Sequence, residues 1–136
     1  MISQNKFGAA AYQSINAEGS IESADQHKLV EMLYSGAITK INQARSHMEM
    51  NNTLNKGKTI GEAISIIEEL RRTLNMEEGG ELAVNLHDLY EYMKTRLLQA
   101  NLKNDSEMLD EVKRLISTLL DGWNNIPEST RKEFSA

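Results

Sequence analysis

Apolar residues recur at helical spacing through most of this chain, and the clearest run extends from residue 24 to residue 48. At about 100° per residue, its apolar side chains cover roughly half of the helix circumference, which is wider than an ordinary surface helix requires. These side chains are Leu29, Val30, Leu33, Tyr34, Ala37, Ile38, Ile41, Ala44 and Met48. Either neighbouring helices flank this helix on both sides, or part of the apolar stripe is kept for a partner.

Three further stretches keep the 3.6-residue period, at residues 54–75, 81–102 and from about 107 to 125. Polar connections separate them, and no alternating pattern of a β-strand competes. Helices of this length with short connections predict an all-α, antiparallel up-down four-helix bundle. We expect a mobile N-terminal arm at residues 1–24, the bundle at 25–125 and a polar C-terminal tail at 126–136.

Residue types at the connections predict where the helices begin and end. Asp25 is expected to be the N-cap of the first helix, and Asn51 to Thr53 form a turn. Glycines 79 and 80 are expected to stop the second helix, and Asn104 with Glu107 has the spacing of a capping box.

The third helix repeats the apolar surplus of the first. Its seam continues through Tyr90, whereas Val84, Leu98 and Leu102 fall to one side and Tyr92 falls to the other. Two interpretations remain open at this point. The surplus side chains finish the core, or they form a groove that receives an amphipathic helix of a partner.

Composition excludes several classes of function. The chain has a net charge of −5 and lacks the basic stripe that is typical of a nucleic-acid-binding protein. It contains no cysteine, which excludes disulfides and thiolate sites. No apolar run approaches a membrane span, and no signal peptide is evident, so we expect a cytosolic protein. No histidine follows a glutamate at the Glu-x-x-His spacing of di-iron bundles, and no phosphate-binding loop is present. We therefore expect no catalytic residue, metal or cofactor.

Several segments resemble one known family along nearly the whole chain. ADQHKLVEMLYSGAI at residues 24–38 resembles the first helix of the flagellar secretion chaperone FliS family, and GGELAVNLHDLYEYMKTRLLQANLKND at 79–105 resembles its third helix and the following turn. KGKTIGEAISIIEELRRTL, LDEVKRLI, Trp123 and the Ala-Tyr-Gln around Tyr12 fit as well.

This resemblance implies a chaperone for flagellin export. It would bind the disordered C-terminal segment of flagellin, and it would deliver the complex to the cytoplasmic domain of the flagellar export gate, with a co-chaperone as a further partner. The expected partner-binding residues are Tyr12, Ile15, Tyr34, Ile38, Val84, Tyr90, Tyr92, Leu98 and Leu102. In this family the N-terminal arm can occupy the groove, which here would involve Phe7 and Tyr12. The protein would be a monomer or weak homodimer, and the alternative is a self-associating bundle without a client.

Overall fold

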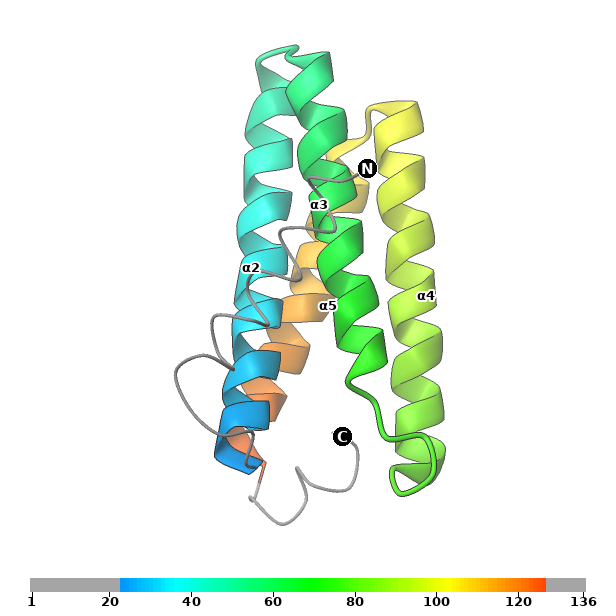
Figure 1. Ribbon diagram of the computed structural model, residues 1–136. Helices are drawn as coiled ribbons and strands as arrows, with labels where there is room; N and C mark the ends of the chain where they lie inside the picture. The colour runs from blue at the N-terminus through cyan, green and yellow to red at the C-terminus, as the bar shows by residue number, and fades with distance from the viewer. Residues whose placement is uncertain (1–22, 127–136) are drawn as a thin grey trace.

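The computed structural model describes residues 23–126 and contains four helices in this range: α2 (Ser23–Glu49), α3 (Thr53–Arg72), α4 (Gly80–Lys103) and α5 (Ser106–Asn125). Successive helices run antiparallel, and α5 returns to pack against α2 (Figure 1). Each helix therefore packs against two neighbours, while α2 and α4 lie diagonally with α3 between them. The predicted four-helix bundle is confirmed.

The connections differ in detail from the sequence-based expectation. Asn51 does form the α2–α3 turn, with a left-handed φ of 58°, and Asn52 caps α3 by accepting the N–H of Asn55. The expected cap at Asp25 is wrong, because α2 already begins at Ser23.

Two other predicted boundaries are also corrected. Helix α3 ends at Arg72, so glycines 79 and 80 do not stop it. They begin α4 instead, where Gly80 has a φ of +55° that favours glycine. Asn104 ends α4 in the left-handed conformation, and Asp105 is the residue that caps α5, accepting the N–H groups of Glu107 and Met108. Asp and Asn cap helices about equally well by hydrogen bonding. The negative charge of Asp105 also interacts favourably with the positive end of α5, which an amide would not do.

The core is the seam predicted from the first helix, joined by apolar side chains of the other three. Leu33, Ala37, Ile41, Ala44 and Met48 are all buried. At one end of the bundle, Trp123 of α5 donates its indole N–H to the carbonyl of His27 at 3.0 Å, and the two rings stack at 5.0 Å. This contact joins the beginning of α2 to the end of α5 and closes the ring of helices (Figure 1).

Candidate functional site

The predicted site residues fall into three groups. Phe7, Tyr12 and Ile15 lie outside the described residues. Tyr34, Ile38 and Tyr90 point toward the inside of the bundle, and the remaining four lie on the surface of α4. These four are Val84, Tyr92, Leu98 and Leu102.

Tyr34 and Tyr90 are core residues. Each is at most 3% exposed, and their hydroxyl groups meet at 2.6 Å. The bond crosses the bundle between the diagonal helices α2 and α4, which satisfies two hydroxyls that would otherwise be buried without partners. Burial raises the pKa of Tyr34 to about 12. The expectation of an accessible rim at Tyr34 is therefore wrong, and Ile38 beside it is half-buried and packs on the same core.

Val84, Leu98 and Leu102 share one flank of α4. Val84 and Leu102 are separated by a whole number of helical turns, and Leu98 lies one turn before Leu102. All three are exposed, with Leu102 at 84%. Charged side chains lie between Val84 and Leu98, since Glu91 pairs with Lys94 at 2.9 Å. The flank is therefore divided into a single valine and a separate leucine pair.

Tyr92 lies on the opposite flank of α4, toward α5. Its hydroxyl donates to Glu111, and the guanidinium of Arg96 lies 5.9 Å from the centre of its ring while also pairing with Glu111. These contacts hold Tyr92 in a polar network, on a different surface from Leu98 and Leu102.

The sequence-based reasoning missed Leu54, which is 82% exposed at the beginning of α3. One turn later, a Cβ added at Gly57 would lie 3.9 Å from the side-chain nitrogen of Asn101 on α4. Leu54 precedes Gly57 by one turn, Leu98 precedes Asn101 by one turn, and Leu102 follows Leu98 by one turn, so we infer that these leucines lie near the same junction. We refer to Leu54, Leu98 and Leu102 as the α3–α4 patch. An exposed leucine before a glycine on the same face is the signal that could have identified Leu54.

A charged cluster borders this patch farther along the two helices. Glu68 of α3 accepts hydrogen bonds from Arg71 at 3.0 Å and from Lys94 of α4 at 2.7 Å. The Arg71 bond is the main cause that lowers the pKa of Glu68 to about 2, with Lys94 adding to it. The cluster joins α3 to α4 and gives the patch a polar border.

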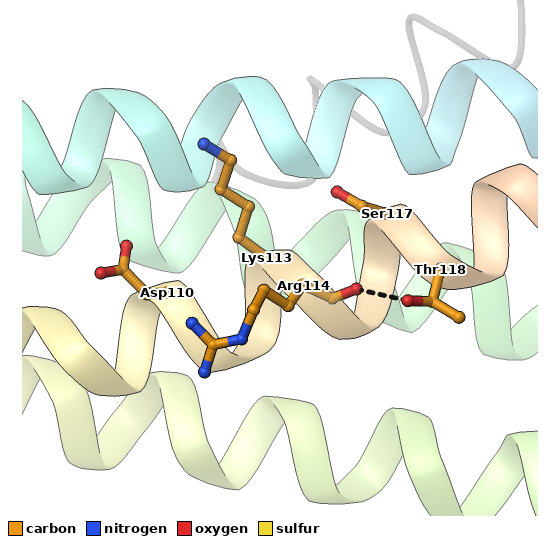
Figure 2. Close-up of a pocket in the computed structure, with 5 residues that line it drawn as sticks. All are labelled: Asp110, Lys113, Arg114, Ser117 and Thr118. Carbon is orange, nitrogen blue, oxygen red and sulfur yellow. Dashed lines mark hydrogen bonds between the residues drawn. The ribbon is translucent and has the colours of Figure 1, made fainter.

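Helix α5 carries a separate hollow of about 480 Å³ whose described lining is Asp110, Lys113, Arg114, Ser117 and Thr118. Figure 2 shows Lys113 and Ser117 extending toward α2, and the hydroxyl of Thr118 donating to the carbonyl of Arg114. Asp110 is already paired with Arg45 of α2. The lining side chains all end in polar groups, but their carbon atoms supply most of the surface of the hollow, which is open to solvent.

Residues 23–126 contain no group of three or more His, Cys, Asp or Glu side chains placed to hold a metal ion. None of the helices in this range is long and apolar enough to cross a membrane.

The fold and its surface define an all-α antiparallel bundle with apolar side chains exposed at the junction of two helices. The chain belongs to the FliS family, because the family described as flagellar protein FliS matches residues 8–130. It is 41% identical to the flagellar secretion chaperone FliS of Salmonella typhimurium over 128 residues, which cover 93% of this chain and 95% of that protein.

Two other relatives agree with this assignment. The flagellar secretion chaperone FliSB of Pseudomonas aeruginosa is 44% identical over 85% of this chain and 91% of its own length. The flagellar secretion chaperone FliS of Bacillus subtilis is 35% identical over 98% of this chain and 94% of its own. The likeness extends along nearly the whole chain in both.

Proposed function

We propose that this protein is a cytosolic flagellar export chaperone that binds the disordered C-terminal segment of flagellin. Binding prevents premature polymerisation of flagellin and helps to deliver it to the flagellar type III export gate. The observation that supports this proposal most directly is the α3–α4 patch, where three leucines remain largely exposed on a protein of the FliS family. The protein acts by binding, without catalysis and without a cofactor.

The patch suits an amphipathic helix. Such a helix presents apolar anchors at i, i+3 or i+4 and i+7, and these would pack against leucines on two adjacent helices. Fully burying one leucine contributes about 1.5–3 kcal/mol. Since Leu98 is 54% exposed and the other two leucines more than 80%, covering the patch contributes about 4 kcal/mol in total.

That contribution is comparable to the cost of ordering the client. Folding a disordered segment on a surface costs about 2–5 kcal/mol and usually buries 1,000–3,000 Å². The patch is therefore an anchor within a longer interface. Val84 and Tyr92 lie on other parts of α4 and would contact further portions of the client.

The N-terminal arm is the proposed competitor for this surface. Phe7, Tyr12 and Ile15 supply apolar anchors on a short segment of the same chain, and a tethered segment competes at a high effective concentration. Flagellin would displace the arm, and the export gate or a co-chaperone would bind the resulting complex.

Titration with a peptide of the C-terminal segment of the cognate flagellin tests the proposal. We expect calorimetry to show saturable one-to-one binding at micromolar concentration or below. In parallel, the protein should keep monomeric flagellin from sedimenting as filaments under polymerising conditions. Absence of peptide binding at micromolar concentration would refute the proposal.

Light scattering separates this proposal from a bundle that only self-associates. A chaperone should form a complex with the mass of one copy of each protein. A homodimer whose mass is independent of concentration, and which does not change on addition of the peptide, would show that the leucines bury one another.

A further inference from the structure

The α2–α3 and α4–α5 turns lie at the same end of the bundle (Figure 1). A buried lysine of α3 bonds to the end of α4 here. Lys56 is only 6% exposed. Its ammonium donates to the carbonyl of Asn101 at 3.1 Å and to the side-chain oxygen of Asn104 at 3.0 Å. An ammonium has three N–H donors, so these two bonds leave one donor without an assigned acceptor.

Lys56 differs from Lys40 and Lys94, which are partly buried lysines with carboxylate partners. Lys40 pairs with Glu62 at 3.1 Å, and Lys94 pairs with Glu68 at 2.7 Å. Within residues 23–126, Lys56 has neutral acceptors and no carboxylate partner. A buried cation without a counter-charge is costly, which makes this position favourable for an anion.

The space beside Lys56 is a hollow of about 160 Å³. This equals roughly five times the volume that a water molecule occupies in the liquid, so a small polyatomic ion fits. Its lining is mainly polar and comes from both turns. The polar residues of this lining are His47, Asn51, Asn52, Thr53, Lys56 and Asn104.

A second, independent feature also indicates a ligand. Nδ1 of His47 is buried and has no hydrogen-bond partner. Buried polar atoms are nearly always paired, and His47 also lines the hollow, so this ring nitrogen lacks a partner beside a polar space. Thr53, the first residue of α3, adds its hydroxyl and the positive end of a 20-residue helix.

We propose that this hollow binds a small oxyanion of carboxylate or phosphate type. One oxygen accepts the third N–H of Lys56, and another accepts the N–H of the His47 tautomer protonated at Nδ1. The hydroxyl of Thr53 donates to the same ion. Because the chain carries a net charge of −5, such an ion is held by these local donors and not by a general attraction.

The bound ion would connect the end of α2, the beginning of α3 and, through Lys56 and Asn104, the end of α4. The inference does not depend on flagellin binding. Since a ligand that binds only the folded state stabilises it, the ion should raise the melting temperature of the free protein.

Calorimetric titration of the full chain with sodium phosphate and with sodium acetate, at constant ionic strength and neutral pH, tests the proposal. We expect saturable one-to-one binding in the millimolar range. Lys56→Met should weaken it about tenfold or more, since it removes a charge-assisted hydrogen bond. Lys58→Met is the matched control, because Lys58 is exposed on the same helix, and it should change affinity by less than about twofold. Tighter binding of phosphate or of acetate identifies which ion the hollow prefers.

Lys56→Met could lose affinity because it fails to fold, so a second variant and a measurement on the unaltered protein test the proposal independently. His47→Phe keeps the ammonium and should still weaken binding several-fold. In the unaltered protein, NMR signals of the His47 ring and the Thr53 amide should shift on titration. Absence of saturable binding by either ion at tens of millimolar would mean that the hollow holds only water, and affinity unchanged by both variants would place the ion elsewhere. Either result overturns the proposal.

Discussion

The hydrogen bond between Tyr34 and Tyr90 gives a sharp test of how the core is built. Replacing either tyrosine by phenylalanine leaves the other hydroxyl buried without a partner, and such an orphaned group costs about 1–3 kcal/mol. Both side chains are at most 3% exposed, so water cannot replace the lost partner without disturbing the core. We expect each single variant to lower the free energy of unfolding by about 1–2 kcal/mol.

The double variant separates this mechanism from a loss of packing. Tyr34→Phe combined with Tyr90→Phe removes both hydroxyls and leaves neither orphaned, so its cost should be about 1 kcal/mol smaller than the sum of the single costs. Urea unfolding of the four proteins measures this coupling. Tyr92→Phe is the control, because the Tyr92 hydroxyl bonds Glu111 on the surface, and it should cost less than about 0.5 kcal/mol. Additive costs, or an equal loss for Tyr92→Phe, would contradict the buried pair.

The same pair predicts an alkaline limit to stability. The pKa of Tyr34 is raised by burial from 10.0 to about 12, so the folded protein keeps a proton that the unfolded chain loses. Stability is therefore unaffected well below pH 10 and falls between about pH 10 and 12, by on the order of 2 kcal/mol. Urea unfolding as a function of pH should show this fall, and Tyr34→Phe should reduce it.

Three further predictions concern the surface and its border. Gly57→Ala should raise the free energy of unfolding by about 0.5–1 kcal/mol in thermal denaturation, because the added methyl meets only an ordinary contact, yet it should weaken flagellin-peptide binding if the client passes this junction. The lowered pKa of Glu68 means that its contribution to stability is present above about pH 4.5 and lost as the pH falls toward about 2. Because the group is partly solvated, we expect a loss of about 1–2 kcal/mol in acid unfolding, and Glu68→Gln should remove it. Deleting residues 1–15 should tighten peptide binding in calorimetry, and unchanged affinity would count against the arm as a competitor.

The sequence predicted the bundle well because its helices are long and strongly periodic. The buried seam through Leu33, Ala37 and Ile41 follows directly from that period. Boundaries were less predictable, since Asn104 and Asp105 are both good caps and only the backbone conformation decides between them.

Polar contacts between helices that are distant in the sequence were harder to predict than the apolar seam. A helical projection places Tyr34 at the edge of the apolar arc, but it does not show that the hydroxyl of Tyr90 meets it from the diagonal helix. Lys56 stands near the beginning of a predicted helix, where a lysine usually keeps its ammonium group in solvent. Its burial depends on the end of α4, which is distant in the sequence and supplies both acceptors.

The central claim is that the α3–α4 patch receives the client, and calorimetric titration of patch variants with the flagellin C-terminal peptide tests it most directly. Leu98→Asp and Leu102→Asp each place a charge where the client would bury apolar surface, and we expect each to weaken binding at least about tenfold. Met32→Asp is the control, because Met32 is also exposed, at 41%, but lies on α2, the helix diagonal to α4. It should change affinity by less than about threefold. Equal losses in all three variants, or unchanged binding in Leu98→Asp and Leu102→Asp, would contradict the account.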